Sequence, residues 1–351
     1  MSLYRKYRPS KWSDVVGQDQ VVAVLKSAIS DNSVSHAYLL SGSRGIGKTS
    51  IARIFAHELA TAPVDLYELD AASNRGIDEI RDLRESVRTL PFESKYKIYI
   101  IDEVHMLTGP AFNALLKTLE EPPPHVIFIL ATTEAHKLPQ TIVSRCQVLS
   151  LKRPSEISVE SLILRVAKAE GYSVDKEAIT LMAILSDGAY RDALTLLEKV
   201  LTISSKKSIT ASEVELLTGT PKVSLVINFT KYVFDGDKTQ ALLTLHNLRE
   251  QDVDMKVFTK FVMRLLRSAM LLNLAPDLKV DIASEHSQLE LDLLAKLSVG
   301  EGTRRLPDLL RALLRAYEEI PYAYVKTLPL ELAVVELDLK SSVSKSNAVQ
   351  V

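Results

Sequence analysis

Residues 42–49 read Gly42-Ser43-Arg44-Gly45-Ile46-Gly47-Lys48-Thr49, a full match to the pattern G-x-x-x-x-G-K-[ST]. An apolar run, Ala37–Ser41, precedes the motif and a helical pattern, Thr49–Leu59, follows it, which is the context in which this motif binds phosphate. Its glycines allow backbone N–H groups to turn inward around phosphates, and the helix N-terminus adds positive potential. The sequence therefore predicts a phosphate-binding loop, and a glycine-rich turn that matches by chance is the disfavoured alternative.

The loop gives individual residues distinct roles. Lys48 is expected to reach the β- and γ-phosphates of a bound nucleoside triphosphate, and the Thr49 hydroxyl is expected to ligate Mg²⁺. The other predicted nucleotide contacts are Gly42, Ser43, Arg44, Gly45, Ile46, Gly47 and Ser50.

A second stretch, Lys97–Glu103, is an apolar run that ends in two carboxylates. Asp102 is expected to hold the Mg²⁺ shell, and Glu103 to polarise an attacking water. Taken alone, the stretch is better explained as a strand that runs into a solvated acidic turn. Together with the phosphate-binding loop, it predicts a site that hydrolyses ATP.

Short β-rich runs alternate with helical patterns over residues 1–154, which predicts an α/β fold with a parallel sheet. The predicted strands are Ala37–Ser41, Val64–Asp70, Lys97–Ile101, Val126–Thr132 and Gln147–Leu151, and the predicted helices are Val21–Ile29, Thr49–Leu59, Ile77–Thr89 and Ala111–Leu119. Beyond Leu151 the strand signal almost disappears. We therefore expect an α/β domain over 1–154, a small helical domain over 155–218, a larger helical domain over 219–339 and a flexible tail over 340–351.

Composition narrows the class of protein. Hydrophobic residues make up 46% of the chain and charged residues 25%, which are ordinary values for a globular protein. The formal net charge is −1, so contact with nucleic acid would need a local basic patch. The single cysteine excludes an internal disulfide and suits a reducing compartment. No signal peptide or membrane-spanning stretch is recognisable, and a cytoplasmic protein without membrane contact is predicted.

Several further motifs, taken together, resemble those of one protein family. They are Asp102-Glu103-Val104-His105-Met106-Leu107, Asn113–Pro123, Ala131-Thr132-Thr133, Ser144-Arg145-Cys146, Tyr7-Arg8-Pro9 and Val16-Gly17-Gln18. In these motifs the chain resembles the AAA+ clamp-loader ATPases, and within them the gamma/tau subunits of bacterial DNA polymerase III. The resemblance implies a P-loop ATPase domain, a helical lid domain and an all-helical collar that serves oligomerisation.

The resemblance also implies roles for single residues. Thr133, at the end of its strand, would sense the γ-phosphate, and Arg191 would be a second sensor that reaches from the lid. Arg145 would be an arginine finger offered in trans to ATP on a neighbouring subunit, where a guanidinium neutralises charge on the transferring phosphoryl group. The residues alone leave two alternatives, a surface salt bridge for Arg145 and a helix ion pair with Asp187 or Asp192 for Arg191. The residues that would line the adenine pocket are Tyr7, Arg8 and Val16.

One departure from the family concerns zinc. Gamma/tau subunits usually carry a four-cysteine zinc module between the helix after the phosphate-binding loop and the next strand. Here the segment Leu59–Val64 joins the two directly and contains no cysteine. Cys146 is the only thiol, and one thiolate cannot form a tetrahedral zinc site. No zinc is therefore predicted.

Basic side chains recur along the helical pattern Ile77–Thr89 at Arg81, Arg84 and Arg88, shortly after Arg75. From spacing alone, a solvated helix face with ion pairs to acidic neighbours is favoured. The clamp-loader resemblance favours contacts with DNA phosphates instead, and Arg75 and Arg81 are then the best candidates.

The predicted function is that of an ATP-driven motor subunit of the bacterial replicative clamp loader. In that role a ring of subunits opens the sliding clamp and loads it onto primer–template DNA, which triggers hydrolysis. The expected partners are further gamma/tau copies, the delta and delta-prime subunits, the clamp and the DNA, in the cytoplasm at the nucleoid. The alternatives are another AAA+ DNA-remodelling ATPase, a replication-factor small subunit of archaeal or eukaryotic type, or a non-hydrolysing structural subunit of the ring, which the intact loop disfavours.

Overall fold

The computed structural model describes residues 1–74, 76–204, 207–251 and 253–336. These residues form two compact units, one from Met1–Val174 with Met182–Lys207 and the other from Asp175–Leu181 with the chain from Ser208 onward. The division into three domains that the sequence suggests stays a prediction, and the predicted tail, 340–351, lies outside the described residues.

The first unit is built on a five-stranded parallel sheet in the order β2-β3-β4-β1-β5. Its strands are β1 (Ala37–Ser41), β2 (Leu66–Asp70), β3 (Lys97–Asp102), β4 (Val126–Thr132) and β5 (Gln147–Ser150). Each strand coincides with a predicted one to within two residues at either end. The prediction of an α/β fold with a parallel sheet is therefore confirmed.

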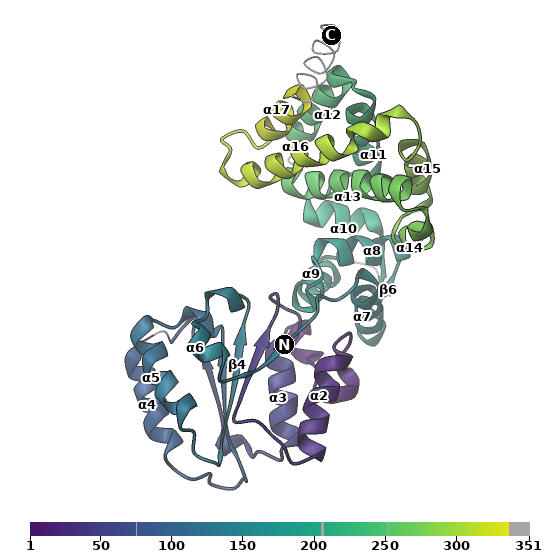
Figure 1. Cartoon of the computed structure of the whole chain (residues 1–351). Coiled ribbons are helices and arrows are strands. Elements are labelled where there is room, and N and C mark those ends of the chain that lie inside the picture. Colours follow the sequence, from purple (N-terminus) through teal and green to yellow (C-terminus); the bar gives the residue numbers. More distant parts are fainter. Residues whose placement is uncertain (75, 205–206, 252, 337–351) are drawn as a thin grey trace, which may run out of the picture. The chain divides into compact units, whose positions relative to one another are not determined.

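Helices cover both faces of this sheet (Figure 1). They are α2 (Asp19–Ser30) and α3 (Lys48–Glu58) on one face, and α4 (Ile77–Val87) and α5 (Gly109–Glu120) on the other. Successive strand residues point to opposite faces, so Ile98 and Ile100 pack on the side of α2 and α3 whereas Tyr99 and Ile101 pack on the side of α4 and α5. The unit also contains α1 (Leu3–Lys6), α6 (Gln140–Val143), α7 (Glu156–Ala169), β6 (Ser173–Val174) and α9 (Tyr190–Ile203).

The carboxyl ends of β1, β3 and β4 meet at one edge of the sheet. The register pairs Ser41 of β1 with Thr132 of β4, and Ile101 of β3 with Leu130 of β4. The phosphate-binding loop, the two carboxylates after β3 and the residues after β4 therefore leave the sheet side by side. In open α/β sheets this is the edge at which ligands bind.

The second unit is helical. Its helices are α10 (Ala211–Thr218), α11 (Val223–Asp235), α12 (Lys238–Glu250), α13 (Met255–Leu274), α14 (Lys279–Glu285), α15 (Gln288–Leu297), α16 (Leu306–Glu319) and α17 (Leu328–Glu336), with the two-residue strand β7 (Ser208–Ile209) before them and α8 (Lys176–Leu185) shared with the first unit. Helix α13 packs against α11, α15 and α16, and the rings of Phe229 and Phe258 meet at 5.0 Å in this core. In the part of the chain that the structure describes, no helix combines the length and apolarity needed to cross a membrane.

Helix α4 ends at Val87, two residues before the predicted end. Two side chains from outside the helix bind the backbone carbonyl groups at this end. The Lys97 ammonium donates to the Ser86 carbonyl at 2.8 Å, and His125 Nε2 lies 3.1 Å from the carbonyls of Val87 and Thr89. Helix ends need such partners for their last carbonyl groups, and local sequence does not reveal partners this far away.

Strand β2 begins later than predicted because Pro63–Asp65 form a 3₁₀ turn that directs the Asp65 side chain inward. This carboxylate is fully buried and accepts the backbone N–H groups of Phe92, Glu93 and Ser94 at 2.6, 2.9 and 2.9 Å. Burial by itself raises the pKa of Asp65, but the N–H donors outweigh burial and hold the pKa below its usual range. Asp65 therefore fastens the loop before β3 as a carboxylate.

Replacing Asp65 with asparagine should lower the free energy of unfolding by about 1–3 kcal/mol, because one amide oxygen cannot satisfy three N–H donors. Urea unfolding of the full chain measures the change, and Glu93→Gln at an exposed neighbour is the matched control. Because the folded pKa is lowered, the contribution of Asp65 is present above the unfolded pKa, about 3.9, and is lost as the pH falls through the folded value. The gap between variant and wild type should therefore shrink in acid, and equal stability at pH 7 would contradict the assignment.

Candidate active site

The first unit surrounds a cleft of about 1030 Å³, which is large enough for a nucleotide. The predicted site residues that line it are Tyr7, Arg8, Val16, Arg44, Gly45, Ile46, Gly47, Lys48, Thr49, Ser50, Asp102, Glu103 and Arg191. The predicted residues outside its lining are Gly42, Ser43, Thr133, Arg145 and Arg81. The cleft thus brings together the loop, the carboxylates and Arg191, the predicted second sensor.

Lys48 is the first residue of α3 and is only 6% exposed. Its ammonium donates to the carbonyls of Gly42 and Ser43 at 2.8 and 2.9 Å. Burial lowers the pKa of Lys48, and the neighbouring carboxylates oppose that shift. Gly42 has φ +146°, and a Cβ there would lie 2.6 Å from the Ile46 side chain. Only glycine therefore suits the position where the chain leaves β1.

The two predicted Mg²⁺ ligands lie in direct contact. The Thr49 hydroxyl donates to Asp102 Oδ2 at 2.6 Å, although one residue lies in the first turn of α3 and the other ends β3. The other oxygen, Asp102 Oδ1, accepts the backbone N–H of Glu103 at 3.0 Å. Hydroxyl and carboxylate oxygens are the donors that Mg²⁺ prefers, so this pair fits the metal that accompanies a nucleoside triphosphate.

Glu103 follows β3 in a left-handed backbone conformation, with φ 48°. Its Oε2 accepts the Thr133 hydroxyl at 3.0 Å and the Thr133 backbone N–H at 3.3 Å. The predicted general base and the predicted γ-phosphate sensor therefore share one hydrogen-bonded contact, even though Thr133 does not line the cleft.

Arg191 lies at the start of α9, and its backbone N–H donates to the Gly45 carbonyl at 3.3 Å. Its guanidinium carbon lies 4.8 Å from the ring centre of Tyr4, within the range of a cation–π contact. Asp187, one alternative ion-pair partner, instead binds Arg153 at 2.6 Å. The first turn of α9 thus packs directly on the phosphate-binding loop.

The N-terminal segment also contributes to the cleft. Tyr7 donates its hydroxyl to Glu170 Oε1 at 2.5 Å, and Arg8 Nε donates to Ser50 Oγ at 3.1 Å. Burial lowers the pKa of Arg8, and repulsion by a nearby arginine adds to the shift. These contacts fix the segment beside α3. A role for Tyr7, Arg8 and Val16 in binding adenine stays a prediction.

Arg145 follows α6 and is held within its own chain. Its guanidinium binds Glu120 Oε1 at 2.7 Å and donates to the Thr141 carbonyl at 2.8 Å. The salt bridge that the residues alone suggest is therefore present. A role in trans stays a prediction, because the structure contains a single chain.

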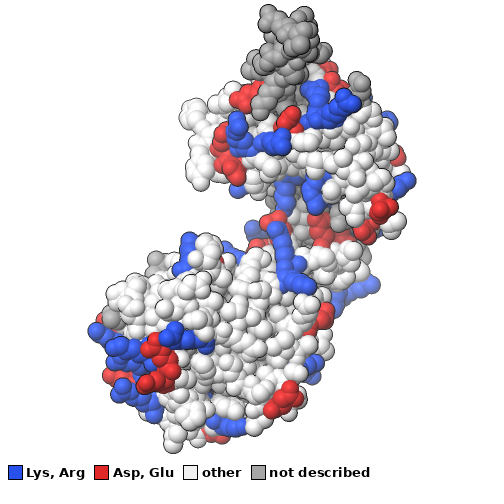
Figure 2. All heavy atoms as spheres, viewed as in Figure 1, with Lys and Arg blue, Asp and Glu red and all other residues white. Residues whose placement is uncertain are grey.

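The predicted DNA-binding residues belong to the region of α4. Arg81 is exposed and pairs with Asp78 at 3.1 Å, whereas Arg75 lies outside the described residues. Basic and acidic side chains are interspersed over α4 and α5 (Figure 2), so this surface carries both signs of charge. Contact with DNA stays a prediction for both arginines.

The sequence does not predict several residues of the site, among them Tyr4, Arg165 and His105. Tyr4 and Arg165 line the cleft, and His105 Nδ1 lies 3.4 Å from Glu103 Oε2. His105 is part of the motif around Asp102, and Tyr4 lies just before the motif around Tyr7, so proximity to both motifs was a usable signal. Arg165 lies in an ordinary helical pattern and carries none.

The described residues contain no group of three or more His, Cys, Asp and Glu side chains that could hold a metal ion. Burial raises the pKa of the Cys146 thiol to about 11, so this group is protonated at neutral pH and is a poor metal ligand. The prediction of no zinc stays a prediction.

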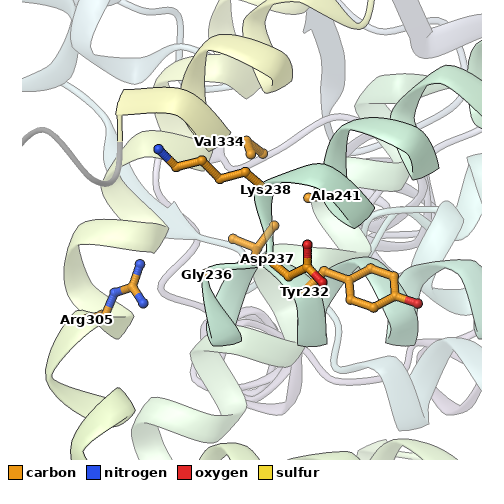
Figure 3. Close-up of a pocket in the computed structure, with 8 residues that line it drawn as sticks. Tyr232, Gly236, Asp237, Lys238, Ala241, Arg305 and Val334 are labelled. Carbon is orange, nitrogen blue, oxygen red and sulfur yellow. The ribbon is translucent and has the colours of Figure 1, made fainter.

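A second pocket lies in the helical unit (Figure 3). Its volume is about 10 Å³, which is room for about one water molecule. The residues around it include Tyr232, Asp237, Lys238 and Arg305. A pocket of this size does not accept a substrate, whereas the cleft of the first unit is large enough for a nucleotide.

Known proteins resemble this chain over most of its length. The family model described as DNA polymerase III, delta subunit, matches residues 17–65 and 62–155. DNA polymerase III subunit tau of Bacillus subtilis is 36% identical over 380 residues, which cover 100% of this chain and 65% of that protein. DNA polymerase III subunit gamma of Buchnera aphidicola subsp. Schizaphis graminum is 33% identical over 315 residues, which cover 84% of this chain and 86% of that protein. The chain thus spans just under two thirds of the Bacillus subtilis relative.

Among solved structures, the Thermotoga maritima RuvB Holliday junction branch migration motor has a TM-score of 0.52 and 20% sequence identity, over 75% of this chain and 92% of that one. At this identity the likeness concerns the fold alone, and it agrees with the AAA+ architecture of the parallel sheet and its helices. Because a third of its residues are identical to those of a gamma subunit over most of both chains, this chain belongs to the gamma/tau family of DNA polymerase III subunits.

Proposed function

We propose that this chain hydrolyses ATP as a motor subunit of the bacterial replicative clamp loader. The observation that carries the proposal is the 2.6 Å hydrogen bond between Thr49 and Asp102, beside the buried Lys48 and beside Glu103. A phosphate-binding lysine, two oxygen ligands for Mg²⁺ and a candidate general base thus occupy one cleft, which is the set that phosphoryl transfer requires.

Each residue of this set has one task in the proposed reaction. The ammonium of Lys48, which now donates to two loop carbonyls, would bind the β- and γ-phosphates instead. Thr49 and Asp102 would hold Mg²⁺, which neutralises charge on the phosphates. Glu103 would orient the attacking water and accept its proton. The cleft thereby supplies positioning and charge stabilisation for hydrolysis.

The remaining candidates would act on the γ-phosphate. Thr133 would contact it from the end of β4, and Arg191 would contact it from the first turn of α9 after leaving the ring of Tyr4. Arg145 would exchange Glu120 for the triphosphate bound to a neighbouring subunit. An arginine supplied in this way stabilises charge that develops in the transition state.

The proposal extends to assembly and location. The partners would be further gamma/tau copies and the delta and delta-prime subunits in a ring, together with the sliding clamp and primer–template DNA, in the cytoplasm at the nucleoid. Residues 155–218 would form the lid and residues 219–339 the collar. The support is family membership, because the relatives are themselves subunits of DNA polymerase III.

Steady-state ATP hydrolysis with Mg²⁺ tests the proposal in three mixtures. These are the chain with its other loader subunits, the same with primer–template DNA, and the same with both DNA and the cognate clamp. Stimulation by DNA that rises further with the clamp is the expected result. A rate that ignores the clamp and rises when branched DNA replaces the primer–template DNA would indicate a remodelling ATPase. No hydrolysis in any mixture would indicate a structural ring subunit.

Replacing Lys48 with alanine should abolish ATP binding, because it removes the buried ammonium that would bind the β- and γ-phosphates. Fluorescence titration of a labelled ATP analogue against the full chain measures the loss. Lys26→Ala, an exposed lysine on α2, is the matched control and should bind ATP as the wild type does. Undiminished binding by Lys48→Ala would refute the assignment of the loop.

A further inference from the structure

His105 lies between two carboxylates at the tips of β3 and β4. Its Nδ1 lies 3.4 Å from Glu103 Oε2 and 3.0 Å from Thr132 Oγ1, and its Nε2 lies 3.0 Å from Glu134 Oε2. The side chain is 7% exposed, whereas the Glu134 side chain is 35% exposed. His105 is therefore a buried ring between two partly exposed carboxylates, Glu103 at 27% and Glu134 at 35%.

The hydrogen bonds around the ring are consistent with one arrangement. Thr132 Oγ1 accepts the backbone N–H of Glu134 at 3.0 Å, so its own proton is available to Nδ1 of His105. Nε2–H of His105 then donates to Glu134. In this tautomer both ring nitrogens are satisfied and the ring orientation is fixed, as it is for histidines whose second nitrogen is held by a carboxylate.

The ring consequently connects the two strand tips that carry the hydrolytic groups. Glu103 precedes His105 by two residues and is bound by Thr133, while Thr133 is flanked by the two partners of His105, Thr132 and Glu134. The left-handed backbone at Glu103, φ 48°, is unfavourable for a residue with a side chain and persists only where neighbouring contacts impose it. His105 supplies such contacts on the Thr133 side of the Glu103–Thr133 pair, because it is bound to Thr132 and Glu134, the two residues that flank Thr133.

We propose that His105 is a positioning residue that keeps Glu103 and Thr133 in register for the attack of water on ATP. The proposal rests on the ATPase function proposed above and deepens it. His105 acts on Glu103 through Thr132 and Glu134, which hold Thr133, and it is not among the residues that line the cleft. Its loss should therefore reduce turnover and leave ATP affinity unchanged, because the phosphate-binding groups on the loop and α3 are independent of it.

The test begins with His105→Ala in the full chain, assembled with its loader subunits and stimulated by DNA. We expect kcat for ATP hydrolysis to fall about 10- to 100-fold, the range observed when groups that orient metal ligands are removed. The Kd for a labelled ATP analogue should stay within about twofold of the wild type. His136→Ala, an exposed histidine three residues after Thr133, is the matched control and should leave kcat unchanged.

Two conservative variants separate positioning from packing. In His105→Asn the amide oxygen takes the place of Nδ1 and preserves the contact with Thr132. In His105→Gln the amide takes the place of Nε2 and preserves only the contact with Glu134. We expect asparagine to restore most of kcat and glutamine little of it, with similar thermal unfolding midpoints for the two variants.

Several results would overturn the proposal. They are wild-type kcat for His105→Ala, equal rescue by asparagine and glutamine, or a loss of ATP affinity that matches the loss of kcat. If the wild-type assembly does not hydrolyse ATP, the proposed function itself is wrong. If the wild type hydrolyses ATP and His105→Ala does so at the same rate, only the role of His105 is wrong.

Discussion

Replacing Arg145 with alanine should lower ATP hydrolysis by the assembled ring about 10³- to 10⁵-fold, while ATP binding by the isolated chain stays unchanged. Arg145 is bound to Glu120 within its own chain and is not among the residues that line its own cleft. Its contribution would therefore appear only when a neighbour's ATP replaces Glu120. Hydrolysis by the ring and nucleotide titration of the single chain measure the two quantities.

Two controls make this result specific to Arg145. Arg249→Ala, an exposed arginine on α12, removes a positive charge elsewhere and should leave hydrolysis unchanged. The Arg145→Ala variant should still assemble into the ring, as measured by size-exclusion chromatography. If Arg145→Ala abolished ATP binding by the isolated chain, the assignment in trans would be wrong.

Replacing Glu103 with glutamine should lower hydrolysis about 10²- to 10⁴-fold, the contribution of a positioned general base. The amide keeps the size of the side chain and can still accept the Thr133 hydroxyl, but it cannot take a proton from water. ATP should therefore bind with unchanged affinity and remain bound intact. Single-turnover hydrolysis and a nucleotide titration together measure this separation.

Glu58→Gln, at an exposed glutamate at the end of α3, is the matched control for the change of charge. It should hydrolyse ATP at the wild-type rate. A Glu103→Gln variant that hydrolyses ATP at the wild-type rate would show that Glu103 is not the general base. The proposed role of His105, which depends on Glu103, would then also be wrong.

Much of the first unit is predictable because its signals are local. Strand β4 is apolar from Val126 to Ala131 and buried throughout, so the run is visible without knowledge of its neighbours. The loop from Gly42 to Thr49 requires glycine where the backbone takes positive φ values. Because the strands are parallel, the positions of Asp102 and Thr133 at strand ends already place them at the edge where the loop lies.

The end of α4 and the remaining contacts of the site depend on the tertiary fold. Helix α4 stops at Val87 because Lys97 and His125 reach its carbonyls, and no feature within the helix indicates this. Arg191 contacts Tyr4, and Arg145 contacts Glu120, through the tertiary fold alone. The charge of such residues predicts that they bind some other side chain, but it does not identify that side chain.

The ends of β2 and β3 opposite the cleft carry the buried Asp65 and Lys97, whose hydrogen bonds secure the adjoining loop and the end of α4. A loss of 1–2 kcal/mol in folding free energy is enough to change the abundance of a protein in the cell several-fold. Natural variation at this edge would therefore alter how many copies a cell maintains, whereas variation at the cleft would alter how fast each copy works.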